Sequence, residues 1–423
     1  AMQSHTGAIA GEDFVLEAVL QQKGIIRCQT MQEFFDLTQA FTWGNIPAGP
    51  RLAIISNAGG PAVLAADAAV NAGLEVSQLV DVLGDALAEK YPQAIEEIFA
   101  ADKADSVLAI LTPQIMTEVE KTAQSIAEIS RKYSQPIFPS FIGGAKISAG
   151  EKIFNEQKVP NFPYPERAVF CLSAMWQYKK HLQIEDVTEP VPWTTNIDFS
   201  IAKTIFSKAR EKTLDPFEIN KLLTSIGLSA PATLKISTFE EARSFVRDWG
   251  YPLVLKIASA QLLHKTDIDG VITNIVRETE LQEAFNKLRS IISKLNINVS
   301  IQAQKDIENG VEVIVGVKRD PTFGPILLFG AGGTLSELIV DRNLFLLPID
   351  LNSAKKLVQQ SKIYTLLKGY RGGSMLALER LYDLIVRLAK LAEEFPEIAE
   401  IEINPVIVTH DDTFAVDGKI ILR

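Results

Sequence analysis

The chain has 423 residues, 47% of them hydrophobic and 22% charged, which is typical of a globular protein and too long for one compact core. Its formal net charge of −10 excludes a nucleic-acid backbone as the main partner, because that binding needs clustered Lys and Arg. Two distant cysteines, Cys28 and Cys171, exclude a disulfide framework and indicate a reducing cytoplasm, and no apolar run is long enough to cross a membrane.

The first segment, residues 1–47, predicts a small-residue loop, a helix, a short strand and a second helix. EDFVLEAVLQQKG (12–24) predicts a helix that ends at Gly24, and IIRC (25–28) predicts the strand. Thr30 and Glu33 have the spacing of a capping box at the start of the second helix. Because a lone strand between two helices cannot bury both of its faces, we expect the end of a larger domain here.

The second segment, residues 48–184, alternates strands and helices. Strands are predicted at RLAIISN (51–57), LEVSQL (74–79), SVLAILT (106–112) and PIFPSF (136–141). This alternation predicts a flavodoxin-like parallel sheet. The stretch that follows, EDVTEPVPWTTN (185–196), lacks a hydrophobic period and predicts a linker.

The third segment, residues 197–423, starts with helices and then mixes strands and helices with short turns, which predicts an α+β domain. Ser237 and Glu240 have capping-box spacing ahead of a helix that ends at Gly250. The strand candidates are SAPATLKI (229–236), YPLVLKIAS (251–259), VEVIVGV (311–317), PILLFG (325–330), IEINPVIVT (401–409) and FAVDGKIIL (414–422).

The last two strand candidates predict a hairpin that carries a metal site. If Thr409 pairs with Phe414, position 404 lies opposite 419, and Asn404 and Asp417 become diagonal neighbours on one face. An amide oxygen and a carboxylate suit Mg²⁺, and Glu402 shares that face. The alternative is that Asn404 belongs to a turn or bulge and Asp417 is a paired surface charge.

Lys256 and Glu312 are candidate nucleotide-binding residues. Each is a charged residue within an otherwise apolar strand, and a buried lysine costs desolvation free energy unless it meets an anion such as a phosphate. Glu312 could accept a hydrogen bond from a ribose. Both side chains could instead point to solvent.

Two glycine loops, SNAGGPAVLAAD (56–67) and GAGGTLSEL (330–338), are candidate phosphate sites, although neither is a P-loop. Gly59 and Gly60 precede a predicted helix, whose free N–H groups favour an anion. The alternative is that these glycines only form turns. His5, in SHTGAIAG, and His264, in LLHKTDIDGV, lie in loops, where a histidine can be a base, a ligand, a phosphoryl carrier or an ordinary hydrogen-bonded residue.

Taken in order, these motifs resemble the ADP-forming acyl-CoA synthetases (acetate–CoA ligase, ADP-forming), which are relatives of succinyl-CoA synthetase. The resemblance covers essentially the whole chain. It rests on SHTGAIAG (4–11), RLAIISNAGGPAVLAADA (51–68), LAILTPQIM (108–116), VLKI (254–257), HKTDIDGV (264–271), GVEVIVGVKRDPTFGPILLFGAGG (310–333), LLKGYRGG (366–373), EINPVIVT (402–409) and VDGK (416–419).

The resemblance implies a phosphohistidine relay in which acyl-CoA, phosphate and ADP give the acid, CoA and ATP reversibly. His5 would take the phosphoryl group and His264 would carry it between distant sites. The helix at Gly59 and Gly60 would grip the phosphorylated histidine. Residues 1–47 would end a succinyl-CoA-synthetase-like ligase domain, residues 48–184 would form a second, flavodoxin-like ligase domain, and residues 197–423 would form an ATP-grasp domain.

In that ATP-grasp domain, the resemblance places Lys256 and Glu312 on ATP or ADP, and Asn404 and Asp417 on Mg²⁺. The family's N-terminal CoA-binding domain and the first half of its ligase domain are not seen ahead of Ala1, so we expect them in the same or a partner chain, and an oligomer. The family's usual insertion between Leu79 and Val80 is also missing.

One further departure concerns the loop after His264, where Asp269-Gly270 replaces the family's usual Gly-Gly. An alternative function is the ligase-like regulatory region of a protein lysine acetyltransferase, which shares this domain order. A third is a nucleotide-binding module without chemistry of its own.

Overall fold

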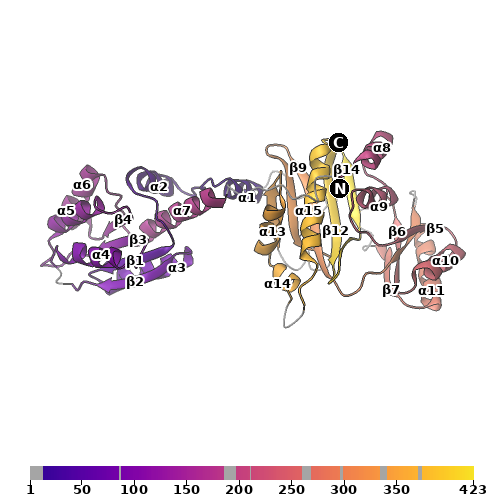
Figure 1. Cartoon of the computed structure of the whole chain (residues 1–423), viewed down its shortest axis with the longest axis horizontal. Helices are drawn as coiled ribbons and strands as arrows, with labels where there is room; N and C mark the ends of the chain where they lie inside the picture. The colour runs from indigo at the N-terminus through magenta and orange to yellow at the C-terminus, as the bar shows by residue number, and fades with distance from the viewer. Residues whose placement is uncertain are drawn as a thin grey trace. The chain divides into compact units, whose positions relative to one another are not determined.

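In the computed structural model, the chain forms two compact units (Figure 1). We call the described part of Lys23–Val187 the parallel-sheet unit, and the described part of Ala1–Gln22 and Thr188–Arg423 the two-sheet unit. The structure describes residues 13–84, 87–184, 197–209, 211–259, 268–295, 299–333, 341–369 and 374–423.

The parallel-sheet unit contains the predicted flavodoxin-like sheet. Its strand order is β2-β1-β3-β4, and every pairing is parallel. The strands are β1 (Arg51–Ser56), β2 (Glu75–Asp81), β3 (Ser106–Leu111) and β4 (Ile137–Phe141). The central strand β3 is buried at every position, as its continuous apolar run requires.

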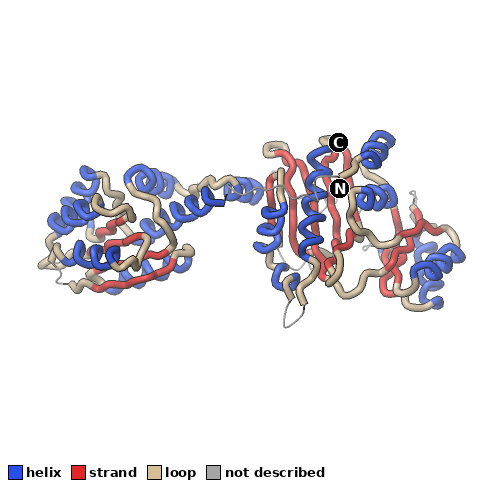
Figure 2. Tube along the Cα trace, viewed as in Figure 1, coloured by secondary structure: helices blue, strands red, loops and turns tan. Residues whose placement is uncertain are grey.

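Helices cover both faces of this sheet (Figure 2). One face packs against α2 (Met31–Trp43), α3 (Gly59–Asn71) and α7 (Pro165–Ile184), and the other against α4 (Lys90–Ala100), α5 (Val119–Ser130) and α6 (Ser148–Gln157), which follows the 3-10 helix η1 (Gly144–Ile147). The α/β prediction for this segment is confirmed.

The beginning of the chain differs from the prediction in two details. The predicted strand at 25–28 is wrong: this stretch is irregular and pairs with neither edge strand, β2 or β4, of the described sheet. Thr30 caps α2 by accepting from the Glu33 backbone N–H at 3.1 Å, but the Glu33 carboxylate accepts from Gln29 N–H at 2.5 Å, and not from Thr30.

The larger sheet of the two-sheet unit has the order β11-β10-β9-β12-β13, with β14 also paired to β12. Its strands are β9 (Val311–Asp320), β10 (Gly324–Ala331), β11 (Arg342–Leu346), β12 (Ile398–Val408), β13 (Thr413–Ala415) and β14 (Gly418–Leu422). Its core includes residues of α8 (Ser200–Lys208), α9 (Pro216–Ser225), α13 (Leu351–Gln360), α14 (Tyr364–Leu367) and α15 (Leu378–Glu394).

The smaller sheet is antiparallel, in the order β5-β8-β6-β7, and packs against α10 (Phe239–Trp249) and α11 (Glu278–Ile292). Its strands are β5 (Thr233–Ile236), β6 (Leu253–Ala258), β7 (Val271–Ile275) and β8 (Ser300–Lys305). The capping box of α10 joins Thr238 and Glu241, one residue later than the predicted Ser237 and Glu240, because Thr238 is the residue with extended backbone next to the helix.

Helix α1 (Asp13–Gln22) packs in the two-sheet unit, although α2 follows it closely in sequence and packs in the other unit. Val15 is buried with Ile314, Ile326 and Leu328 on the sheet face opposite the α15 core. The Gln22 side chain donates to Leu346 O at 2.8 Å and accepts from Leu346 N–H at 2.6 Å. The segment expected as one piece over residues 1–47 therefore contributes helices to both units.

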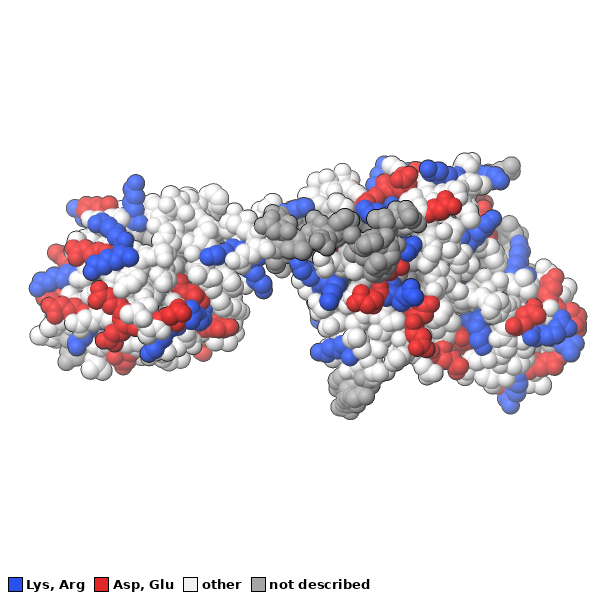
Figure 3. Space-filling model, viewed as in Figure 1, with Lys and Arg blue, Asp and Glu red and all other residues white. Residues whose placement is uncertain are grey.

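Among the described helices, none combines the length and apolar composition needed to span a bilayer. On the surface shown in Figure 3, Lys and Arg side chains are interspersed with Asp and Glu. The predicted linker, residues 185–196, lies outside the described residues.

Candidate functional site

The C-terminal hairpin brings Asn404 and Asp417 together, in a register that differs by two residues from the predicted one. Thr409 pairs with Asp412, its N–H donating to Asp412 O at 2.9 Å, so the predicted pairing with Phe414 is wrong. The turn is tighter because the Thr409 hydroxyl also donates to Asp412 O and accepts from Asp412 N–H.

As a result, Asn404 lies directly opposite Asp417 and not diagonal to it. The Asn404 N–H donates to Asp417 O at 2.9 Å. The pairing of β12 with β9 shifts between Ile403 and Val406, so Asn404 and Pro405 form an irregular step in the strand. A two-residue shift keeps the same face, so the predicted proximity survives the register error.

Lys256 on β6, in the smaller sheet, extends to the segment opposite Asn404. Its side chain is buried, with Nζ 3.3 Å from Val416 O and 3.8 Å from Asp417 Oδ2. The solvent-facing alternative for Lys256 is therefore wrong. Pro216, Ile219, Asn220 and Leu223 of α9 line a small pocket together with these residues.

Glu312 on β9 is connected to Asn404 through Gly333. Gly333 has a φ of +56° and donates its N–H to Asn404 Oδ1 at 2.9 Å. A Cβ at Gly333 would overlap Glu312 Oε2, so this carboxylate lies directly against the glycine. Gly333 is an unforeseen part of the site, and only its place in GAGG (330–333) hinted at such a role.

Four of the predicted residues thus form one continuous set of contacts: Lys256 with Asp417, Asp417 with Asn404, and Asn404 through Gly333 with Glu312. Glu402, on the same hairpin, is also buried and lies opposite Lys419. The chemistry gathered here is one buried ammonium, several carboxylates and an amide oxygen.

This donor set fits a hard divalent cation. Asn404 Oδ1 accepts one hydrogen bond and has a second lone pair, and the Asp417 carboxylate is only partly buried. Mg²⁺ needs only one or two protein oxygens when phosphates and water complete its shell. Within the described ranges, no three His, Cys, Asp or Glu side chains cluster as a self-sufficient metal site.

The second candidate site lies in the parallel-sheet unit, at the start of α3. Gly59 and Gly60 are exposed, and a Cβ at either glycine would meet no atom within 4 Å. Asn57 fixes the preceding loop by donating to Thr112 O and accepting from Thr112 N–H, both at 2.8 Å. The helix therefore presents open N–H groups at the carboxyl edge of the sheet.

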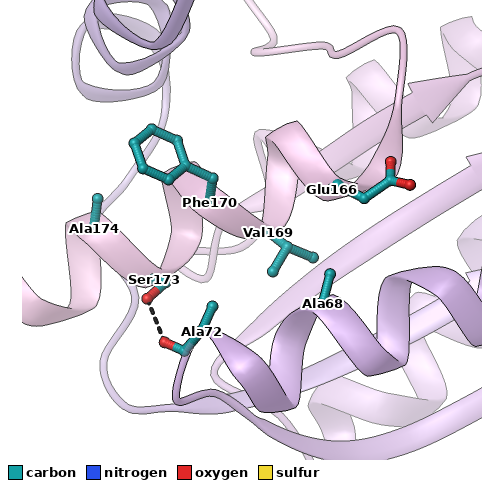
Figure 4. A pocket seen from close by; sticks show the side chains of 7 residues that line it. All are labelled: Ala68, Ala72, Glu166, Val169, Phe170, Ser173 and Ala174. Atoms are coloured by element: carbon teal, nitrogen blue, oxygen red, sulfur yellow. Dashed lines mark hydrogen bonds between the residues drawn. The ribbon is translucent and has the colours of Figure 1, made fainter. Parts of the chain in front are cut away.

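His5 and His264 lie outside the described residues. A further pocket lies between α3 and α7, where Ser173 Oγ donates to Ala72 O at 2.7 Å (Figure 4). Its lining is mostly apolar and contains none of the predicted site residues.

Two family models match the chain. The ATP-grasp domain model matches residues 206–422, and the succinyl-CoA ligase-like flavodoxin domain model matches residues 1–41. The expected ATP-grasp domain is therefore confirmed.

Two ligases match all or nearly all of this chain. The 4-hydroxybutyrate–CoA ligase [ADP-forming] of Nitrosopumilus maritimus is 31% identical over 96% of this chain and 62% of its own length. The acetate–CoA ligase [ADP-forming] I of Archaeoglobus fulgidus is 31% identical over 100% of this chain and 64% of its own length. This chain thus spans less than two thirds of the length of either relative.

A shorter relative is covered almost completely. The beta subunit of acetate–CoA ligase [ADP-forming] I from Pyrococcus furiosus is 36% identical over 51% of this chain and 94% of that subunit. Among solved structures, an acetyl-coenzyme A synthetase 1 of Ca. Korarchaeum cryptofilum with coenzyme A and Ca-AMPCP matches at a TM-score of 0.49, with 33% identity, 53% of this chain and 99% of that chain.

Proposed function

This chain belongs to the family of ADP-forming acetate–CoA and acyl-CoA ligases, and from that membership we propose that it performs the phosphoryl-transfer part of a reversible acid–CoA ligase. The overall reaction would convert acyl-CoA, phosphate and ADP to the acid, CoA and ATP. Because the chain spans only part of its longer relatives, we expect the CoA-binding part from additional polypeptide or a partner subunit.

The observation that carries this proposal is the contact set of Lys256, Asp417, Asn404 and Glu312. A buried ammonium beside carboxylates can bind a phosphate that arrives with its own cation, because the cation offsets repulsion between carboxylate and phosphate. Lys256 would bind the nucleotide phosphates and Glu312 a ribose hydroxyl. Asn404 and Asp417 would hold Mg²⁺, which screens phosphate charge when bound.

In the relay formed by His5 and His264, a histidine would exchange the phosphoryl group with the nucleotide. In the direction of ATP use, the lone pair of a neutral ring nitrogen attacks the γ-phosphorus, and the bond from phosphorus to the bridging oxygen breaks. ADP leaves, and the proton on the other ring nitrogen passes to solvent. His264 would carry the group between distant sites, and the N–H groups at Gly59 and Gly60 would bind it on the acyl side.

Labelling with [γ-³²P]ATP and Mg²⁺ tests this proposal. We expect label on histidine, stable in base and labile in acid, that is lost in His264→Ala. His410→Ala is the matched control, because His410 is an exposed hairpin-turn histidine whose loss should leave labelling intact.

Lys256→Met should lower labelling and weaken ATP binding at least about tenfold, since it removes a charge-assisted contact. Lys235→Met, an exposed lysine on β5, should change neither. Undiminished label in both His5→Ala and His264→Ala would refute the relay. Nucleotide binding without any label on histidine would instead favour a binding module without chemistry.

A further inference from the structure

Strand β8 presents a polar stripe to the proposed nucleotide site. Ile301 and Ala303 point into the core shared with α10 and α11, so the alternate side chains Gln302 and Gln304 point to the opposite side. Gln302 pairs directly with Lys256 on β6. The two side chains therefore lie side by side on the face that reaches Val416 and Asp417.

Three polar side chains on this face are almost fully buried: Lys256 is 4% exposed, Gln302 3% and Gln304 1%. Two of them bond the same carbonyl, since Lys256 Nζ and Gln304 Nε2 lie 3.3 Å and 3.1 Å from Val416 O. Gln302 differs, because its Oε1 has no hydrogen-bond partner among the residues that the structure describes.

A buried amide oxygen without a partner is unfavourable, so native proteins rarely keep one without a use. Gln302 lines the same small pocket as Lys256 and Asp417, which places its side chain at the proposed nucleotide site. An acceptor atom requires a ligand that donates. Phosphate oxygens near pH 7 act mainly as acceptors, so the phosphates that Lys256 would bind are poor partners for Gln302 Oε1.

A nucleotide has donors on its sugar and on its base. The proposed function, on which this inference rests, already places Glu312 at the ribose, which leaves the base. The N6 amine of adenine donates and the neighbouring N7 accepts, and one glutamine amide can satisfy both atoms at once. Guanine presents two acceptors, O6 and N7, at the same edge, and one of them would face the amide oxygen.

We propose that Gln302 recognises the N6/N7 edge of adenine and makes this site selective for adenine over guanine nucleotides. Oε1 accepts from the N6 amine, and Nε2 donates to N7. Gln302 is thus a specificity-determining residue of the nucleotide site, next to the lysine that binds the phosphates.

The test compares wild type with Gln302→Met, a substitution that keeps side-chain length but removes both polar atoms. Calorimetric titration with ADP, GDP and IDP gives the dissociation constants. Wild type should bind ADP at least about tenfold more tightly than GDP or IDP. Gln302→Met should weaken ADP binding by a similar factor and abolish the preference.

The thermal midpoint without nucleotide provides a second readout. Gln302→Met should leave it unchanged or raise it, because the substitution removes an acceptor without a protein partner. Gln304→Met is the matched control on the same strand and should lower it, since Gln304 bonds Val416 O.

Three results would overturn the inference. One is a retained preference for ADP in Gln302→Met, and another is a fall in its thermal midpoint comparable to that of Gln304→Met. The third is that Gln302→Met no longer discriminates between ADP and 2′-deoxy-ADP, which would show that the Gln302 amide binds the ribose and not the base. If wild type binds no nucleotide, the proposed function fails together with this inference, whereas binding that is insensitive to Gln302 refutes the inference alone.

Discussion

The side-chain amide of Gln22 hydrogen-bonds both backbone groups of Leu346, at 2.8 Å and 2.6 Å, as a neighbouring strand would. Leu346 ends β11, an edge strand of the larger sheet. Gln22, the last residue of α1, therefore satisfies the backbone groups of Leu346 at the sheet edge. At the other end of the helix, the Val15 side chain is buried against the sheet.

Gln22→Ala should release this edge. Two hydrogen bonds, each contributing about 1 kcal/mol, are lost, so the Leu346 amide should exchange with solvent at least about tenfold faster. Hydrogen–deuterium exchange measures this rate. Gln21→Ala, at an exposed position of the same helix, should leave the exchange rate of Leu346 unchanged. An unchanged rate in Gln22→Ala would show that the Gln22 side chain does not hold α1 in place.

Gly333→Ala should disable the proposed nucleotide site. The new Cβ would overlap Glu312 Oε2 and displace the N–H that donates to Asn404. We expect ATP affinity to fall at least about tenfold by titration calorimetry, because two site groups move together. Gly324→Ala is the matched control, since its φ of +87° gives similar strain in open space. Equal affinity loss in both variants would contradict the arrangement.

Asp36→Asn should destabilise the parallel-sheet unit. Asp36 accepts from Arg167 Nε at 2.6 Å and from its terminal nitrogen at 2.5 Å, and joins α2 to α7 with only 8% of its side chain exposed. Breaking a buried ion pair costs about 3 kcal/mol or more, measurable by urea unfolding. Glu96→Gln, in the exposed pair with Lys132, should cost less than about 1 kcal/mol. A similar cost for both would refute the buried role.

Asp105 should make the free energy of unfolding depend on pH in the acid range. Burial alone would raise the pKa of Asp105, but hydrogen bonds from the side chain and backbone N–H of Arg51 outweigh burial and lower it. A lowered pKa stabilises the fold at pH values above the ordinary pKa of about 4, and this stabilisation disappears as pH falls through the folded-state pKa.

Urea midpoints of wild type and Asp105→Asn between pH 3 and pH 7 measure this dependence. The stability difference should be constant near neutrality and should narrow below about pH 4. A difference that is independent of pH across this range would assign the effect to packing and not to charge.

The sequence predicted the four strands of the parallel sheet because each is a short apolar run between turn residues. The same pattern misled at 25–28, where Ile25 is exposed, Ile26 to Cys28 are only partly buried, and no strand forms. Whether an apolar segment finds a neighbouring strand depends on the folded sheet and cannot be read from the segment itself.

The candidate site was also partly predictable. Lys256 and Glu312 stood out as charges in apolar strands, and an even register error left Asn404 beside Asp417. Gln302 could not be found in the same way, because an unpartnered oxygen becomes visible only when the surrounding strands are in place. The roles of His5 and His264 stay a prediction.

The packing of α1 in the two-sheet unit has a consequence for how the molecule holds together. The polypeptide passes between the units twice, after Gln22 and again near Val187. A protease that cut the chain once, between Ile184 and Ile197, would leave two fragments with α1 of the first still seated on the sheet of the second. Packing of α1 would therefore hold the two fragments together without a covalent bond. The cleaved protein should purify as one complex until that helix is displaced.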